Sequence, residues 1–283
     1  MAPAGRLAYR PMLRIDWDRV AADVRDTSHR CTGPVVAVHA VAEGLNSEIA
    51  VVLDTAAGRV FVKGRPAGRP SVTQRREAAI NPFVHHLAPR LLWQTRTDDW
   101  DLLGFEHVAG CHADYAPGSC HLDIVVAVLR QVGAIRCPDR PEVKHAELRW
   151  SEYLDDPVMA ELFAGDTLLH TDFNPLNVLI HGGTARVIDW AWPTRGAAFI
   201  DPACWVVRLI AAGHSAHSAE AWAQRCPAYA TAPVHAIAVF ALVMCRMWNE
   251  IARHEPAPWK QHMAAAARTW LAFMGTKTAI QPA

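Results

Sequence analysis

The sequence HTDFNPLN at residues 170–177, followed by VIDW at residues 187–190, decides the fold. It supplies Asp172, then Asn177 five residues later, then Asp189 twelve residues after that. Carboxylate and amide oxygens are hard ligands, which suit Mg²⁺ rather than a soft metal. Phosphoryl transfer needs such a set, because one carboxylate orients the substrate hydroxyl while an Asn and a second Asp hold Mg²⁺ on the phosphates.

The two carboxylates flank a predicted β-hairpin. Apolar runs at 178–180 and 185–188 are joined by HGGT at 181–184, whose glycines suit a tight turn. The order of Asp, Asn, hairpin and Asp resembles the catalytic loop and the metal-binding segment of kinases. His170, two residues before Asp172, adds to this pattern.

The first hundred residues are predicted to be β-rich. Five short runs predict strands, of which the first three form an antiparallel meander: 35–41, 49–53, 59–63, 91–93 and 102–105. Residues 73–86 have a helical pattern that Pro82 is expected to kink or divide.

Beyond residue 110 the pattern becomes mainly helical. A buried helix is predicted at 122–135, and helical periodicity returns at 142–164 and dominates 201–274. A small sheet followed by a helical region predicts an α+β chain with two lobes. The predicted domains are an N-terminal lobe, an interlobe linker and a C-terminal lobe: 1–104, 105–110 and 111–283.

Two residues upstream fit the same chemistry. Lys63 ends an apolar strand, as the phosphate-binding lysine of kinases does, and Glu77 follows fourteen residues later, where it could pair with Lys63. The alternatives are a solvated lysine on an edge strand and a glutamate on a solvated helix face. Residues 43–47 lie where a glycine-rich loop would cover the phosphates. With one glycine and no GxGxxG, this segment is equally well interpreted as a hairpin turn.

HTDFNPLN and VIDW, with EGLNSE and VFVKG upstream, resemble the aminoglycoside phosphotransferase family of small-molecule kinases over residues 35–202. The resemblance implies a protein-kinase-like bilobal fold with the nucleotide in the cleft between the lobes. It also implies that Asp172 is the catalytic base and that Asn177 and Asp189 bind Mg²⁺. Lys63 would contact the α- and β-phosphates, and Glu77 would orient it.

The resemblance assigns supporting roles to further residues. The backbone of Glu106 and Val108 would contact the nucleotide base, and His170 would brace the catalytic loop. Asp201, in a segment DPA at 201–203, would have a structural role too, although Cys204 and Trp205 stand where the family often has an acidic residue. The loop contacts to the phosphates would come from Gly44, Asn46 and Ser47.

The acceptor is expected to be a small molecule with a hydroxyl group. Only twelve residues separate Asp189 from Asp201 and no APE motif follows, which leaves little room for a peptide-binding activation loop. Residues 111–283 hold only two more acidic than basic residues, whereas a cleft for polycationic aminoglycosides would gather carboxylates. A less cationic antibiotic, a nucleoside or a sugar metabolite is therefore at least as plausible. ATP and GTP are both open as donors.

Composition excludes some other classes of function. Twenty-eight basic residues balance twenty-eight acidic ones, which argues against a nucleic-acid binder with a basic face. The longest apolar run has ten residues, at 236–245, whereas a membrane span needs about 18. Without an export signal, the protein is expected to be cytoplasmic. It is expected to be a monomer or a dimer, with a role in antibiotic resistance or in biosynthesis.

Two functions compete with a small-molecule kinase. One is a catalytically silent nucleotide-binding module on the same fold, and the other is a metal hydrolase built on His170, Asp172 and Asp189.

Overall fold

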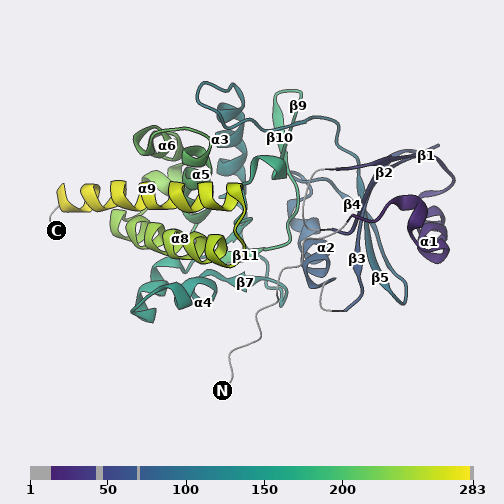
Figure 1. Cartoon of the computed structure of the whole chain (residues 1–283), viewed down its shortest axis with the longest axis horizontal. Helices are drawn as coiled ribbons and strands as arrows, with labels where there is room; N and C mark the ends of the chain where they lie inside the picture. Colours follow the sequence, from purple (N-terminus) through teal and green to yellow (C-terminus); the bar gives the residue numbers. More distant parts are fainter. Residues whose placement is uncertain (1–13, 43–46, 69–70, 281–283) are drawn as a thin grey trace, which may run out of the picture. The chain divides into compact units, whose positions relative to one another are not determined.

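The computed structural model describes residues 14–42, 47–68 and 71–280 (Figure 1). The chain forms two compact units. Unit 1 comprises Met1–Ser71 and Trp93–Gly104, and unit 2 comprises Val72–Leu92 and Phe105–Ala283. Residues 72–92, which the sequence analysis places in the N-terminal lobe, group with unit 2.

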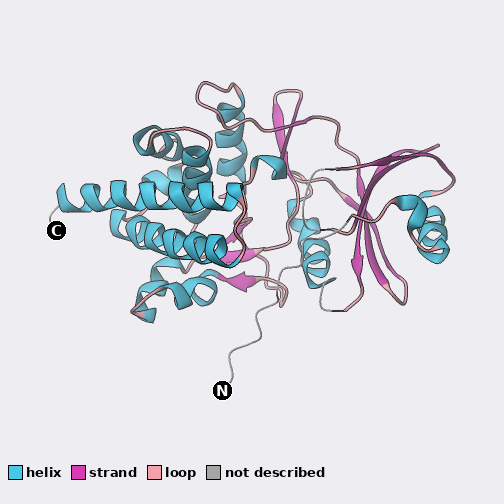
Figure 2. Cartoon of the chain, in the orientation of Figure 1, coloured by secondary structure: helices cyan, strands magenta, loops and turns pink. Residues whose placement is uncertain are grey.

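A five-stranded sheet carries most of unit 1 (Figure 2). Its strand order is β1-β2-β3-β5-β4, and β2 pairs antiparallel with both β1 and β3, so the predicted meander is confirmed. The sheet is apolar where it meets the core of the unit, and β2 in particular is buried at five successive positions. The strands are β1 (Val35–Ala40), β2 (Ile49–Thr55), β3 (Gly58–Pro66), β4 (Leu91–Arg96) and β5 (Trp100–Glu106).

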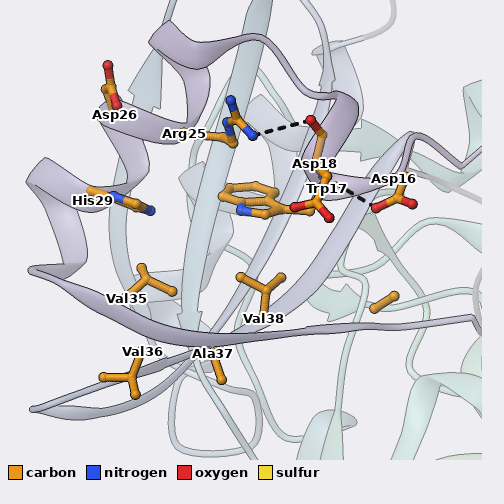
Figure 3. A pocket seen from close by; sticks show the side chains of 11 residues that line it. Asp16, Trp17, Asp18, Arg25, Asp26, His29, Val35, Val36, Ala37 and Val38 are labelled. Carbon is orange, nitrogen blue, oxygen red and sulfur yellow. Dashed lines mark hydrogen bonds between the residues drawn. The ribbon is translucent and has the colours of Figure 1, made fainter.

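The 3₁₀ turn η1 (Trp17–Arg19) and the helix α1 (Ala22–Thr32), which the sequence analysis did not anticipate, pack on this sheet. Trp17, Val20 and Val24 are buried against apolar residues of the strands. An open pocket lies between α1 and β1, lined by Arg25, His29 and neighbouring residues (Figure 3). None of the predicted site residues lines this pocket.

Helices make up most of unit 2, around one large apolar core (Figure 1). Pro82 lies in the last turn of α2 and does not divide it. The predicted helix at 142–164 is wrong in large part: a short helix is followed by the 3₁₀ turns η3 (Ser151–Tyr153) and η4 (Pro157–Phe163). Pro157 disfavours helical backbone at Asp156, which is extended, so one helix cannot run through the whole segment. The helices are α2 (Val72–Val84), α3 (His121–Val132), α4 (Ala146–Trp150), α5 (Ile200–Ala211), α6 (Ala216–Ala223), α7 (Pro227–Ala230), α8 (Val234–His254) and α9 (Pro258–Ile280).

Two small three-stranded sheets in unit 2 hold the segments singled out by the sequence. The first, in the order β10-β9-β6, contains β9 (Val178–His181), β10 (Thr184–Val187) and β6 (Cys111–His112). Its predicted β9–β10 hairpin is confirmed, with positive φ at both turn glycines. The second sheet, in the order β7-β11-β8, contains β7 (Lys144–His145), β11 (Thr194–Gly196) and β8 (Thr167–Leu169).

By length and composition, α8 is the one helix among the described residues that could cross a membrane, with a mean hydropathy of 1.4 over an 18-residue window. That window is 44% buried, and α8 packs against α9 and α5. Core helices of soluble proteins meet the same criteria, so α8 is weak evidence for a span. The absence of a membrane span remains a prediction.

Candidate active site

Residues 170–177, named the catalytic loop after their predicted role, leave β8 and enter β9 through the 3₁₀ turn η5 (Pro175–Asn177). Asn174 caps this turn, because its Oδ1 accepts the backbone N–H of Leu176 at 3.1 Å. Pro175 occupies the first position of the turn, where a missing N–H costs nothing. The local sequence thus fixes how the chain turns between Asp172 and Asn177.

His170 is buried, and both of its ring nitrogens are hydrogen-bonded. Nδ1 accepts the backbone N–H of Asp172 at 3.2 Å, so Nε2 carries the proton and donates to the carbonyl of Ile188 at 2.9 Å. The ring packs edge-on against Phe173 and Trp190, with centroids 5.5 and 4.8 Å away. This arrangement ties the catalytic loop to the segment that carries Asp189.

Asp201, at the start of α5, braces the same loop from the other side. Its Oδ2 and Oδ1 accept the backbone N–H groups of His170 and Thr171 at 2.9 and 2.7 Å. Burial raises the pKa of Asp201, whereas His170, the two N–H groups and Arg149 act to lower it. Thr171 has a φ of 68°, a left-handed conformation that β-branched residues avoid, and the Asp201 carboxylate helps to hold it there.

The side chains of Asp172 and Asn177 are directly linked. Asn177 Nδ2 donates to the backbone carbonyl and to Oδ2 of Asp172, both at 3.0 Å. Because both amide donors point to Asp172, Asn177 Oδ1 is the atom suited to coordinate a cation. The Asp172 side chain is 31% exposed, so a substrate can reach its carboxylate.

Two hydrogen bonds of Ile188 hold the segment that carries Asp189 against the loop at 170–177. The backbone N–H of Ile188 donates to the carbonyl of Asn177 at 2.9 Å, and its carbonyl accepts from His170. Asp189 itself is partly buried and has a φ of 63°, a conformation that aspartate tolerates better than most residues. The hairpin therefore returns the chain so that Asp189 lies next to the end of the catalytic loop.

Arg208 is a site residue that the sequence analysis missed. Its Nη2 forms an ion pair with Asp172 Oδ1 at 2.8 Å, and its guanidinium lies 5.3 Å from the centre of the Trp248 ring. The signal was present: Arg208 follows Asp201 by seven residues, which is two helical turns, so both lie on one face of α5. Because Asp201 is predicted to brace the catalytic loop, that spacing predicts that Arg208 contacts the loop as well.

Lys63 and Glu77 are both buried, at 7% and 5% exposure. Lys63 lies on β3, opposite Ala50 of β2. Because β3 is an interior strand of the sheet, the alternative of a solvated lysine on an edge strand is wrong. Glu77 lies on α2, and its burial likewise excludes a solvated helix face. Lys63 belongs to unit 1 and Glu77 to unit 2, and their pairing remains a prediction.

The remaining predicted nucleotide contacts are spread over the chain. Ser47 is buried just before β2. Gly44 and Asn46 lie outside the described residues. Glu106 ends β5 and Val108 follows it, both partly buried, in the predicted linker.

The donor set at the end of the catalytic loop fits Mg²⁺. This ion takes oxygen ligands and commonly uses one or two protein groups together with phosphates and water, which Asn177 Oδ1 and the Asp189 carboxylate can provide. Among residues 14–42, 47–68 and 71–280, no group of three or more His, Cys, Asp or Glu could hold a metal. His170 has both ring nitrogens engaged, so it is not available as the ligand that a metal hydrolase would need.

An antiparallel sheet in unit 1 and a mainly helical unit 2 with this loop define an α+β, protein-kinase-like fold, as predicted. Solved structures of small-molecule kinases share it. Choline kinase LicA from Streptococcus pneumoniae has a TM-score of 0.63 at 12% identity, covering 89% of this chain and 98% of its own. A thermostable mutant of aminoglycoside phosphotransferase APH(4)-Ia, in a ternary complex with AMP-PNP and hygromycin B, has a TM-score of 0.57 at 15% identity, covering 88% of this chain and 99% of its own.

Macrolide 2′-phosphotransferase MphH from Brachybacterium faecium also matches, with a TM-score of 0.53 at 16% identity, covering 88% of this chain and 98% of its own. No protein-family model matches the sequence, and no curated protein matches it. At these identities the likeness establishes the fold that the sequence motifs predicted.

Proposed function

We propose that the protein is a Mg²⁺-dependent small-molecule kinase that transfers the γ-phosphoryl group of ATP or GTP to a hydroxyl of its acceptor. The observation that carries the proposal is a chain of hydrogen bonds: Asn177 donates to Asp172, and Ile188, the residue before Asp189, bonds to Asn177 and His170. The fold supports it, since its solved neighbours include choline, aminoglycoside and macrolide phosphotransferases.

Asp172 is the proposed catalytic base. Its carboxylate is reachable and is held on both oxygens, by Arg208 at Oδ1 and by Asn177 at Oδ2. A carboxylate fixed in this way orients the acceptor hydroxyl for in-line attack and accepts its proton. Positioning is the main task of a phosphotransferase, because the reaction needs little covalent chemistry from the protein.

Asn177 Oδ1 and the Asp189 carboxylate are the proposed Mg²⁺ ligands. The bound ion would neutralise charge on the phosphates of the nucleotide. Lys63 is proposed to contact the α- and β-phosphates, with Glu77 orienting it. The rest of the nucleotide would be contacted by the loop at Gly44, Asn46 and Ser47 and by the backbone of Glu106 and Val108.

Mass spectrometry of a mixed panel of hydroxyl-bearing antibiotics, nucleosides and sugars tests the proposal. The panel is incubated with protein, Mg²⁺ and either ATP or GTP. We expect one member to gain a phosphoryl group, and Asp172→Asn to reduce its formation by about 10²- to 10⁴-fold, the usual contribution of a positioned base. Asp139→Asn is the matched control, because Asp139 is exposed.

Near-normal turnover in Asp172→Asn would overturn the assignment of the base. If Asp172→Asn were inactive but had also lost AMP-PNP binding, the defect would lie in nucleotide binding and not in the chemical step. Nucleotide binding by the wild type without transfer to any acceptor, and without Mg²⁺-dependent hydrolysis, would favour the silent binding module instead.

A further inference from the structure

Trp192, three residues after Asp189, is surrounded by three cations in unit 2. The Lys144 ammonium lies 4.5 Å from the centre of its indole ring, and the guanidinium carbons of Arg76 and Arg149 lie at 5.7 and 5.8 Å. The cations come from β7, α2 and α4, so three separate elements bring them together. Trp192 itself is 36% exposed, which leaves the cluster open to solvent on one side.

Within the described part of the chain, none of these cations has a carboxylate within ion-pair distance. The side chains of Lys144 and Arg76 also form no hydrogen bond to another described residue. Arg149 donates only through Nη1, to the hydroxyls of Thr171 and Thr194 at 2.7 and 2.8 Å and to the Trp192 carbonyl at 3.4 Å. Its Nε and Nη2, with the other two cations, are donors that a ligand could use.

The three charges oppose one another. Burial, followed by the charges of Arg149 and Arg76, lowers the pKa of Lys144 to about 8. Arg76 acts on Arg149 in the same direction. Groups that raise these pKa values are Glu152 for Lys144, and Cys204, Asp172 and Asp201 for Arg149. Partly buried like charges without a bound counter-ion are costly, so their grouping indicates a ligand of opposite charge.

Another tryptophan in unit 2 shows the usual arrangement. Arg225 lies 4.6 Å from the centre of the Trp222 ring, and it forms an ion pair with Asp123 at 2.6 Å. A single cation over an indole with a carboxylate partner needs no ligand. Around Trp192, by contrast, there are three cations and no carboxylate partner among the described residues. This excess of positive charge is what a bound anion would explain.

The cluster is attached to the catalytic loop. Arg149 donates to the hydroxyl of Thr171, the residue before Asp172, and that hydroxyl donates in turn to the Trp192 carbonyl at 3.2 Å. Lys144 lies opposite Thr194 in the register of β7 and β11, and Thr194 also pairs with Leu169 on β8. An anion bound here would therefore lie beside the loop that carries the base.

We propose that Arg76, Lys144 and Arg149 form an anion-binding site around Trp192 for a phosphate or carboxylate group. Guanidinium groups match such anions through paired N–H donors, and an ammonium adds a compact charge. The group belongs either to the acceptor molecule or to a free anion that acts on the catalytic loop. The link to catalysis rests on the proposed phosphotransferase function, whereas anion binding itself does not.

Calorimetric titration of the full chain with inorganic phosphate tests the site without any reaction. We expect Lys144→Gln and Arg76→Gln each to weaken binding by about tenfold, which is typical of losing one charged hydrogen bond. Arg225→Gln, at the paired cation over Trp222, is the matched control and should bind phosphate as the wild type does. Circular dichroism of each variant checks that the fold is retained.

Lys63→Ala separates this site from the nucleotide phosphates, because Lys63 is the proposed phosphate contact there. Phosphate binding that survives Lys63→Ala and is weakened in Lys144→Gln supports the site around Trp192. The reverse result, or no binding by the wild type at millimolar phosphate, overturns it. Phosphate binding in a protein that transfers no phosphoryl group would remove the proposed function and leave the anion site standing.

Phosphotransfer to matched acceptors distinguishes the two sources of the anion. If the acceptor carries it, kcat/KM for a phosphorylated or carboxylated sugar exceeds that for the neutral sugar, and Lys144→Gln removes the advantage. If it is a free anion, inorganic phosphate changes the rate with a neutral acceptor, and Lys144→Gln abolishes the change. A wild type that shows neither effect contradicts a role of the site in catalysis.

Discussion

Thr171 and Asp189 are the two non-glycine residues in the described part of the chain with positive φ, at 68° and 63°. Each is adjacent to a chemically important position: Thr171 precedes the proposed base, and Asp189 is itself a proposed Mg²⁺ ligand. Such conformations cost about 1–3 kcal/mol and persist only where surrounding contacts impose them. At Thr171 those contacts are the Asp201 carboxylate on its N–H and Arg149 on its hydroxyl. Backbone strain therefore occurs at two points of the candidate site, directly before Asp172 and at Asp189.

Lys144 makes anion binding dependent on pH. Its pKa of about 8 lies below the usual 10.5, because of burial and the charges of Arg149 and Arg76, with Glu152 opposing them. We expect affinity for sulfate, which keeps its charge over this range, to fall as the pH rises from 7 to 9.5 and Lys144 loses its proton. Calorimetry in Lys144→Gln should give a weaker affinity that stays constant over the same range. A wild-type affinity independent of pH would contradict this role of Lys144.

Deprotonation of Lys144, which weakens anion binding, is expected to stabilise the fold. A folded-state pKa below the unfolded value means that the folded protein disfavours the charged lysine. This cost is fully present below pH 8 and is relieved as the pH rises toward 10.5, so Lys144 makes the free energy of unfolding increase over that window. The same proton release that weakens the anion site thus stabilises the fold, as expected for a cluster that needs a bound anion.

At the scale of elements, α5 holds the catalytic loop at two points. Asp201 in its first turn binds the backbone of His170 and Thr171, and Arg208 two turns later binds the carboxylate of Asp172. The helix is buried along most of its length, so it provides a rigid base for both contacts. A segment that lacks the acidic residue expected after DPA thus still braces the loop, through Asp201 and Arg208.

Arg208 is a positioning residue, because it acts on the reaction through Asp172. We expect Arg208→Ala to lower kcat by about tenfold or more, since Asp172 Oδ1 loses its charged hydrogen bond, while KM for the nucleotide changes little. Arg208→Lys should recover part of kcat by restoring the charge without the guanidinium geometry. Steady-state kinetics would contradict this role if KM rose and kcat did not fall, or if the lysine variant gave no recovery.

At the scale of the whole molecule, local patterns in the sequence predicted the meander, the β9–β10 hairpin and the order of the site residues. These features depend on alternation, turn glycines and spacing within a few residues. The strands β7 and β11 were missed because two or three residues carry no period, and their pairing joins segments about fifty residues apart. Arg149 could not be assigned for the same reason, since only the fold brings it to Thr171. The contact of Arg208 with the loop could have been predicted from its helical spacing to Asp201.

Ligand binding should stabilise the molecule in a way that tests the metal assignment. A nucleotide present at a hundred times its Kd adds about 2.7 kcal/mol to the free energy of unfolding, which raises Tm by several degrees in a chain of this size. We expect this increase with AMP-PNP and Mg²⁺ in the wild type and in Asp139→Asn, as followed by differential scanning calorimetry. Asp189→Asn should lose the part of the increase that depends on Mg²⁺, because an amide replaces the charged ligand. An equal increase in the presence of EDTA, or in Asp189→Asn with Mg²⁺, would show that Asp189 does not bind the metal of the nucleotide complex.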